Sequence, residues 1–198
     1  MTPIILASES PRRRQLLADA GFSFDVLSVK VSEIPNKNLN VNAQILDIAQ
    51  RKAIAALPVL KASRPGSFIV VSADTEVIFN DAPLGKPENP EDAFRMLRLL
   101  SGTDHQVITA VCMIESLSTK VLSQTETTQV FFKELTDEQI WTYIQSGEPM
   151  DKAGAYGIQG LAGKFIQKIE GPFDNVVGLP VDLVKKMLKE FGVTPLRK

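Results

Sequence analysis

The sequence predicts an α/β protein with a mixed β-sheet flanked by helices. Segments with a helical pattern and segments with a strand-like pattern alternate along the chain, and some predicted strands follow one another directly. Alternation of this kind is typical of α/β folds, and the direct strand-to-strand connections favour a mixed sheet over a purely parallel one. No internal repeat, low-complexity tract or linker is apparent along the chain.

The first predicted elements are a short buried strand at 2–7 and a helix over 11–20. Ser10 is a typical N-cap residue, Pro11 suits the first helical position, and Gly21 is a typical stop. The helix is therefore defined at both ends by its own residues.

A second strand near 24–28 leads into a polar loop at 33–40. A helix is predicted over 41–57, because apolar residues recur there at helical spacing. Proline disfavours helical backbone in the residue before it, so we expect Pro58 to mark the end of this helix.

A continuous apolar run at 68–73, rich in β-branched residues, predicts a central strand. Asp74 and Thr75 are expected at its end, with a second arm continuing at 76–79. A turn is predicted at Asn80–Asp81, followed by a helix that is capped by Asn89 and Pro90, runs to about Leu100 and stops at Gly102. Two long strands at about 106–115 and 121–132 can pair antiparallel, and a helix with a Thr136–Gln139 capping box follows them and ends at Gly147. The last predicted elements are short strands near 164–169 and 175–177 and a helix from about Pro180 to Phe191.

The composition limits the class of protein and of partner. With 198 residues, 44% of them hydrophobic, the chain can bury one sizeable core, which suits a single domain over 1–198 or two tightly joined lobes. The formal net charge of -1 argues against a nucleic-acid partner. The single cysteine, Cys112, excludes an internal disulfide and suits a reducing compartment. Because neither a membrane-spanning apolar run nor a secretory signal is recognised, we expect a cytoplasmic protein with no membrane partner.

The segment Ser8-Glu9-Ser10-Pro11-Arg12-Arg13-Arg14 joins the first strand to the first helix. A helix N-terminus favours an anion, and serine hydroxyls and arginines add phosphate contacts. The arginines oppose the helix dipole there, and a bound phosphate would offset that conflict. A solvated basic helix face with an ordinary Ser-Pro cap explains the same residues equally well.

Three further motifs each have two interpretations. Asp74 can hold a divalent metal or act as a general base, or it can be a common turn residue. Lys86, in Gly85-Lys86-Pro87, can neutralise phosphate charge or be solvated, and no Walker pattern surrounds it. Gln159, in the glycine-rich segment 146–160, can read the polar edge of a base or belong to a surface loop. His105 is the single histidine and is expected to be structural, so a histidine-based triad or a zinc site is poorly supported.

Taken together, these segments resemble the Maf family over nearly the whole chain. The matching stretches, in the family's order, are Leu6-Ala7-Ser8-x-Ser10-Pro11-Arg12-Arg13, Ala73-Asp74-Thr75, Gly85-Lys86-Pro87, Leu100-Ser101-Gly102 with His105 and Val107, Asp151-Lys152-Ala153-Gly154-Ala155-Tyr156-Gly157-Ile158-Gln159-Gly160, and Asn175-Val176-Val177-Gly178-Leu179-Pro180. The resemblance implies a fold similar to the inosine triphosphate pyrophosphatases, with two lobes around a deep cleft, often as a homodimer. It also implies hydrolysis of a nucleoside triphosphate between the α and β phosphates, with a divalent metal cation, Mg²⁺ or alternatively Mn²⁺.

The resemblance also implies a role for individual residues. Asp74 matches the family's proton acceptor and, with Glu33, its metal position. The matches to phosphate-binding positions are Ser8, Arg13, Lys52 and Lys86, and the matches to positions associated with substrate choice are Arg12, Thr75 and Gln159.

The subgroup of the family that acts on 7-methylguanosine triphosphate has a tryptophan where this chain has Arg12. The chain therefore resembles the other subgroup, which converts dTTP, UTP and modified pyrimidine nucleotides to the monophosphate and pyrophosphate. A non-catalytic, nucleotide-sensing regulator of cell division is the alternative, and it would use the same residues. The presence of both carboxylates and lysines favours the enzyme, because a sensor needs no base.

Overall fold

The computed structural model describes residues 2–118 and 120–196, and the chain divides into two compact units. Unit 1 contains the chain up to Asp74, Thr109–Glu126 and the chain from Gly178 onward. Unit 2 contains Thr75–Ile108 and Thr127–Val177. Three of the four boundaries between the units fall inside strands and the fourth follows Val177, so each unit is built from segments far apart in the sequence.

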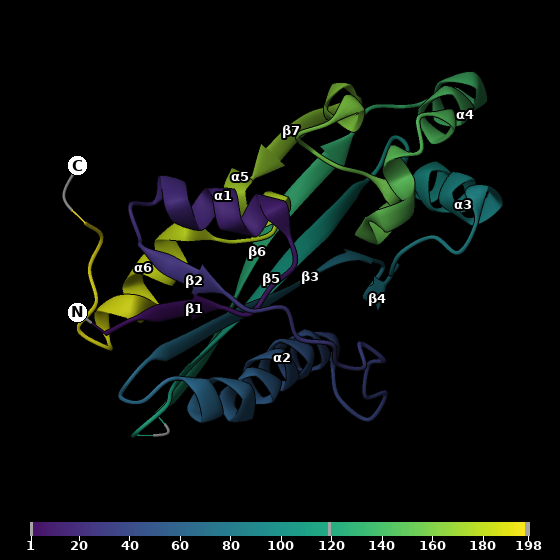
Figure 1. Ribbon diagram of the computed structural model, residues 1–198. Helices are drawn as coiled ribbons and strands as arrows, with labels where there is room; N and C mark the ends of the chain where they lie inside the picture. The colour runs from purple at the N-terminus through teal and green to yellow at the C-terminus, as the bar shows by residue number, and fades with distance from the viewer. Residues whose placement is uncertain (1, 119, 197–198) are drawn as a thin grey trace. The chain divides into compact units, whose positions relative to one another are not determined.

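The described residues form a mixed sheet of 7 strands in the order β2-β1-β3-β5-β6-β7, with β4 paired to β3 (Figure 1). Its strands are β1 (Ile4–Leu6), β2 (Phe24–Val26), β3 (Ile69–Phe79), β4 (Ala82–Pro83), β5 (Asp104–Glu115), β6 (Val121–Phe132) and β7 (Ile166–Glu170). β1 is parallel to β2 and to β3, whereas β3–β4 and β6–β7 are antiparallel. The connection between the neighbouring strands β5 and β6 is too short for a parallel crossover, so these two are antiparallel as predicted. The predicted mixed sheet is confirmed.

Five of the six α-helices in the described residues begin close to a predicted helix start, whereas α5 was not predicted as a helix. They are α1 (Pro11–Asp19), α2 (Val41–Ser63), α3 (Pro90–Leu100), α4 (Asp137–Gln145), α5 (Phe173–Val177) and α6 (Val181–Lys189). The side chains of Ser10, Asn40, Asn89 and Thr136 each cap a helix by accepting a backbone N–H three residues later. The glycine-rich segment contains three 3-10 helices, η1 (Glu148–Asp151), η2 (Ala153–Ala155) and η3 (Leu161–Phe165).

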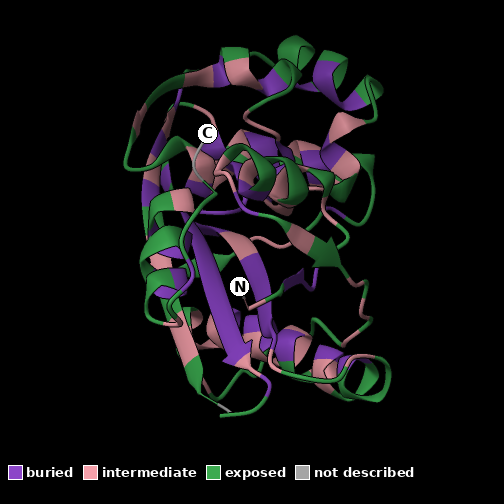
Figure 2. Cartoon of the chain, turned by 60° about the vertical axis from the view of Figure 1, so that its left-hand side comes forward, coloured by how far each residue is buried: buried purple, intermediate pink, exposed green. Residues whose placement is uncertain are grey.

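Unit 1 has helices on both faces of its part of the sheet. Figure 1 shows α1 and α6 on one face and α2 on the other. The first face buries alternate residues of the strands against Leu17 of α1 and Met187 of α6. On the second face, buried Ser72 of β3 donates a hydrogen bond to the carbonyl of Ala49 in α2 at 2.6 Å. Burial on both faces explains the long uninterrupted buried stretches of β3 and β5, which are visible in Figure 2.

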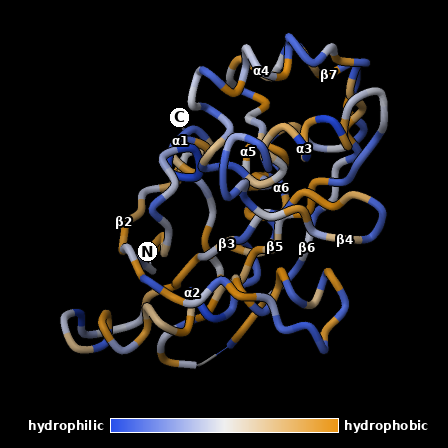
Figure 3. The backbone as a smooth tube through the Cα atoms, turned by 90° about the vertical axis from the view of Figure 1, so that its right-hand side faces the viewer, coloured by the Kyte–Doolittle hydropathy of each residue, from blue (hydrophilic) through white to orange (hydrophobic). Residues whose placement is uncertain are grey.

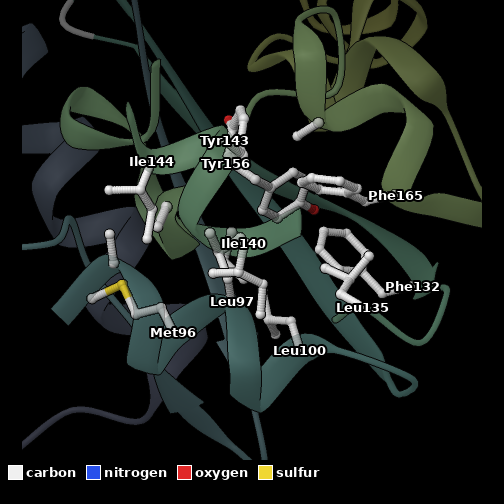
Figure 4. Packing of buried hydrophobic residues seen from close by; sticks show 14 of the residues in the cluster. Met96, Leu97, Leu100, Phe132, Leu135, Ile140, Tyr143, Ile144, Tyr156 and Phe165 are labelled. Carbon is white, nitrogen blue, oxygen red and sulfur yellow. The ribbon is translucent and has the colours of Figure 1, made fainter. Parts of the chain in front are cut away.

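Unit 2 has a separate apolar core, shown in Figure 4. Helices α3 and α4 and the 3-10 helices contribute side chains to it, and so do the unit 2 parts of β3, β5 and β6. Its large buried residues include Met96, Leu97, Phe132, Tyr143 and Phe165. Among the described residues, no helix combines the length and the apolar character that crossing a bilayer requires.

The predicted end of α2 at Pro58 is wrong, because the helix continues through the proline to Ser63. Pro58 cannot donate an i→i−4 hydrogen bond and its ring crowds the preceding turn, but its side chain is exposed and buried Leu60 anchors the following turn to the core. Figure 3 shows hydrophobic and hydrophilic stretches alternating along α2, as expected for a helix with one face on the sheet.

Two strand predictions also differ from the structure. β3 runs without interruption through Asp74 and Thr75, so these residues lie inside the strand and not at its end. The segment 175–177 belongs to helix α5 instead of a strand. The reason is a tertiary anchor: the buried amide of Asn175 donates to the carbonyl of Val107 at 2.9 Å and to the hydroxyl of Thr128 at 3.1 Å. These bonds outweigh the β preference of the two valines that follow.

Candidate functional site

A polar cluster occupies the connection between β1 and α1 in unit 1. Ser10 is the N-cap of α1, and its hydroxyl accepts the backbone N–H of Arg13 at 3.4 Å. The hydroxyl of buried Ser8 accepts the N–H of Ser10 at 3.2 Å and a guanidinium N–H of Arg13 at 3.5 Å. The first turn carries no acidic residue to offset its arginines. The cluster therefore combines a helix N-terminus, hydroxyl groups and cations, which together suit an anion.

Arg13 is held in a defined orientation. Its Nε donates to the carbonyl of Gly178 at 2.8 Å, just before α6. Burial lowers the pKa of Arg13, an effect that Asp74 and Glu33 oppose through their negative charges and that neighbouring Arg12 reinforces. The guanidinium of Arg13 thus shares one electrostatic environment with both carboxylates and with Arg12.

Lys52 connects three parts of unit 1. Its Nζ donates to Oδ1 of Asp74 at 2.8 Å and forms an ion pair with Oε1 of Glu33 at 2.7 Å. Lys52 lies on α2, Asp74 on β3 and Glu33 in the loop before α2. The side chains of Lys52 and Asp74 are only 12% and 10% exposed, whereas that of Glu33 is 50% exposed. One ammonium therefore pairs with two carboxylates, one of which is mostly withdrawn from solvent, and the three groups together keep one negative charge.

Asp74 reaches this position from the middle of a strand, not from its carboxyl end. Side chains two residues apart in a strand point to the same face, so Asp74 shares the face of Ser72, which bonds to α2. The side chain of Asp74 therefore points toward α2, where it meets Lys52. The expected convergence of charged groups is present, although the predicted place of Asp74 in its strand is wrong.

Arg51 is a residue that the sequence did not single out. Its guanidinium donates to the carbonyl of Ser32 and, at 3.0 Å, to the carbonyl of Ile34, the residues on either side of Glu33. Asp47, one turn earlier in α2, pairs with Arg51 at 3.0 Å. The i,i+4 spacing of Asp47 and Arg51 indicates this pair, but no local pattern indicates the bonds to the loop. Arg51 therefore holds the loop that carries Glu33 against α2.

The carboxylates of Glu33 and Asp74 suit a small, hard divalent cation. Both bond to the same Lys52 nitrogen, so the two carboxylates lie on either side of one ammonium group. In the described part of the chain, no group of three or more His, Cys, Asp or Glu side chains could hold a metal. Mg²⁺ is commonly bound through one or two carboxylates, with water and substrate phosphates completing its shell, and this pair matches that pattern.

Unit 2 contains Thr75, Lys86 and Gln159. Thr75 lies on β3, exposed Lys86 lies in the loop before α3, and exposed Gln159 lies between η2 and η3. The N–H of Gly154 donates to the carbonyl of Gly85 at 2.8 Å, so the Gly85-Lys86-Pro87 loop contacts the glycine-rich segment. Gly154 has a φ of +65°, and a Cβ there would lie 2.9 Å from Val77. This glycine is therefore required by backbone conformation and by packing.

The single histidine and the single cysteine lie in the cores of the two units. His105 Nε2 is 2.7 Å from the hydroxyl of Tyr156, and its ring packs edge-on against Phe132 and Tyr156. Burial lowers the pKa of His105 to about 4, so the imidazole is neutral near pH 7. Burial raises the pKa of the Cys112 thiol, because it disfavours the charged thiolate. Both environments match the structural roles expected for these residues.

The structure thus brings one group of predicted site residues together within unit 1. That group consists of Ser8, Arg12, Arg13, Glu33, Lys52 and Asp74. Thr75, Lys86 and Gln159 belong to unit 2, where the loop carrying Lys86 contacts Gly154 of the glycine-rich segment.

A family model and several known proteins match this chain over most of its length. The family model described as "Maf-like protein" matches residues 3–191. The "dTTP/UTP pyrophosphatase" of Bdellovibrio bacteriovorus is 71% identical over 188 residues, which cover 95% of this chain and 98% of that protein. The protein of the same name from Pelotomaculum thermopropionicum is 44% identical over 196 residues, 99% of this chain and 100% of that one. Among solved structures, the nucleoside-triphosphatase (dITP/XTP pyrophosphatase) of Mycobacterium abscessus aligns with a TM-score of 0.36 at 10% identity, over 66% of this chain and 73% of that one.

Proposed function

The chain belongs to the Maf family, and from this premise we propose that it is a nucleoside triphosphate pyrophosphatase that hydrolyses dTTP and UTP. The products are the nucleoside monophosphate and pyrophosphate. The names of the relatives support this choice of substrate, and modified pyrimidine nucleotides belong to the same chemical class.

The observation that carries the proposal is the group formed by Lys52, Asp74 and Glu33, with Arg13 in the same electrostatic environment. A triphosphate has several negative charges, and its hydrolysis needs both cations to offset them and a base to take a proton from water. This group supplies both in one place. Ser8 and the N-terminus of α1 add neutral and dipolar donors for a phosphate.

In the proposed reaction, Asp74 accepts a proton from a water molecule, whose oxygen attacks the α phosphorus. The bond from that phosphorus to the oxygen bridging the α and β phosphates breaks, and pyrophosphate leaves with the bonding electrons. Lys52 and Arg13 offset the charge on the phosphate oxygens, and Lys86 is proposed as a further phosphate-binding residue. Mg²⁺ held by Glu33 and Asp74, or Mn²⁺ in its place, would supply further charge neutralisation when bound.

Substrate choice is assigned to Arg12, Thr75 and Gln159. An amide both donates and accepts hydrogen bonds, so Gln159 suits the polar edge of a pyrimidine base. Arg12 occupies the position at which the 7-methylguanosine triphosphate subgroup of the family has a tryptophan.

The nucleotide is the proposed partner, with no nucleic acid or membrane involved. A cytoplasmic location is proposed from the single buried cysteine, which suits a reducing compartment. A homodimer and a single domain over 1–198 remain predictions, and light scattering of the purified protein tests the first of them.

Release of pyrophosphate from a panel of dTTP, UTP, CTP, GTP and 7-methylguanosine triphosphate, with Mg²⁺ or with EDTA, tests the proposed function. We expect metal-dependent release concentrated on dTTP and UTP. Release from none of the five, with tight nucleotide binding still measured, would refute the enzyme and favour the sensing regulator.

A further inference from the structure

Gln159 lies in a tight turn of unit 2. The N–H of Gly160 donates to the carbonyl of Gly157 at 3.1 Å, which makes Ile158 and Gln159 the two central residues of the turn. The side chain of Gln159 is exposed and makes no hydrogen bond to any residue within 2–118 or 120–196. Its amide is therefore available to a ligand, and its position depends on how the turn is held.

Two side chains, Tyr143 and Glu148, hold the two ends of this turn. The N–H of Gly157 donates to the hydroxyl of Tyr143 at 3.3 Å, and the N–H of Leu161 donates to Oε2 of Glu148 at 3.0 Å. The Tyr143 hydroxyl in turn donates to Oε1 of Glu148 at 2.9 Å. Each oxygen of the carboxylate thus has one donor, and a single chain of hydrogen bonds links both ends of the turn.

Tyr143 anchors this series of hydrogen bonds in the core of unit 2. Its side chain is almost fully buried, and its ring meets that of Phe165 edge-on at a centroid distance of 5.3 Å (Figure 4). Burial, followed by the hydrogen bond to Glu148, raises the pKa of Tyr143, so its hydroxyl keeps the proton that it donates. The connection from the core to the carboxylate is therefore made by a buried and ordered side chain.

The turn also lies directly against this support. A Cβ on Gly160 would lie 2.2 Å from Oε1 of Glu148, and a Cβ on Gly157 would lie 2.8 Å from Cε of Lys152. Lys152 itself donates to the backbone carbonyl of Glu148 at 2.9 Å. Close packing of this kind leaves the turn little freedom to shift, and it explains why glycine occupies both positions.

We propose that Glu148 is a positioning residue for base selection. Its carboxylate, together with Tyr143, fixes the turn that presents Gln159 to the base. This inference rests on the proposed function, because it takes nucleotide selection by Gln159 as its premise.

The test is Glu148→Gln, a change that keeps the shape of the side chain. An amide nitrogen cannot accept a hydrogen bond, so either Tyr143 or the N–H of Leu161 loses its acceptor. We expect the ratio of kcat/KM for dTTP over dGTP to fall about tenfold, roughly the effect of one lost hydrogen bond to a charged group. Tyr143→Phe should lower the ratio in the same direction. The matched control is Glu138→Gln, an exposed carboxylate on α4, which should leave the ratio unchanged.

A double-mutant cycle separates positioning from a general structural role. If Glu148 acts through Gln159, Glu148→Gln has no further effect on the ratio once Gln159 is replaced by alanine. Equal loss of kcat/KM on both nucleotides after Glu148→Gln, or additive effects of the two substitutions on the ratio, would overturn the proposal.

Binding distinguishes failure of this inference from failure of the proposed function. Calorimetric affinities for dTTP and dGTP are measured with the protein carrying Asp74→Asn, with and without Glu148→Gln. If the unsubstituted protein releases no pyrophosphate, the proposed function fails, while a dTTP preference in binding that Glu148→Gln reduces still supports positioning. If Glu148→Gln leaves the binding preference for dTTP unchanged, the inference about Glu148 is wrong and the proposed function is unaffected.

Discussion

At the scale of single residues, Asp74 is both part of an ion pair and the proposed base. Its carboxylate lies on a mostly buried strand face, and its charge is balanced by Lys52, which also binds Glu33. A buried carboxylate costs much free energy unless it is paired, so this arrangement keeps a charged base in a partly desolvated place. The ion pair with Lys52 stabilises the fold, and the negative charge is proposed to make Asp74 the base of the reaction.

Asp74→Asn separates these two effects, since the amide has nearly the same shape but is not a base. We expect kcat for dTTP to fall by about three orders of magnitude, within the range that general bases contribute, with nucleotide affinity largely retained. Pyrophosphate release and calorimetric binding measure the two quantities. Asp182→Asn, an exposed change on α6, is the control, and turnover by Asp74→Asn near the unsubstituted rate would remove Asp74 from its role.

His105 predicts a dependence of stability on pH. Its pKa is lowered from 6.5 to about 4 by burial, so between these values the unfolded chain binds a proton that the folded chain does not. The stabilisation is complete above pH 6.5 and is lost as the pH falls toward 4, with a magnitude on the order of 3 kcal/mol. Urea unfolding at pH 7, 5 and 4 should therefore show the stability advantage over His105→Gln shrinking with acidity. A constant difference across this range would contradict the depressed pKa.

At the scale of elements, the loop between β2 and α2 has no regular structure, yet it carries Glu33. Arg51 bonds to the carbonyls on both sides of Glu33 and so limits where its carboxylate can go. Groups that orient metal ligands commonly change metal affinity by about 10- to 100-fold when removed.

Arg51→Met should therefore raise the Mg²⁺ concentration needed for half-maximal turnover by about tenfold, while turnover at saturating Mg²⁺ is mostly retained. A titration of activity with Mg²⁺ measures both values. Arg64→Met, which removes an exposed pair with Asp25, provides the control. An unchanged Mg²⁺ requirement would show that the loop needs no such support.

Elements differ in how well their own residues define them. The caps at Ser10, Asn89 and Thr136 were predicted, because each is a hydrogen bond to a backbone group three residues away. Pro58 and the segment 175–177 were predicted wrongly, because distant contacts outweigh the local preference at both places. The turn at Asn80–Asp81 was predicted and has positive φ at both residues, as a tight connection between antiparallel strands requires.

At the scale of the whole molecule, ligand binding should stabilise the folded chain by mass action. A non-hydrolysable dTTP analogue at 100 times its Kd should add about 2.7 kcal/mol to the free energy of unfolding. If a divalent metal takes part in binding, EDTA should reduce this gain and raise the analogue concentration that is required. Thermal unfolding with Mg²⁺ and with EDTA measures the effect, and identical shifts in both would argue against a metal-assisted site.

The sequence by itself determined the class of the fold, most helix starts and the candidate residues. These depend on local hydrogen bonds, on hydrophobic spacing and on motifs that are contiguous along the chain. The tertiary structure alone decided three sets of contacts. They are the ion pairs of Lys52 with Glu33 and Asp74, the hydrogen bonds of Arg51 to the loop around Glu33, and the support of the Gln159 turn by Glu148. Such contacts join loops, helices and strands that only packing brings together, so no local pattern of residues contains them.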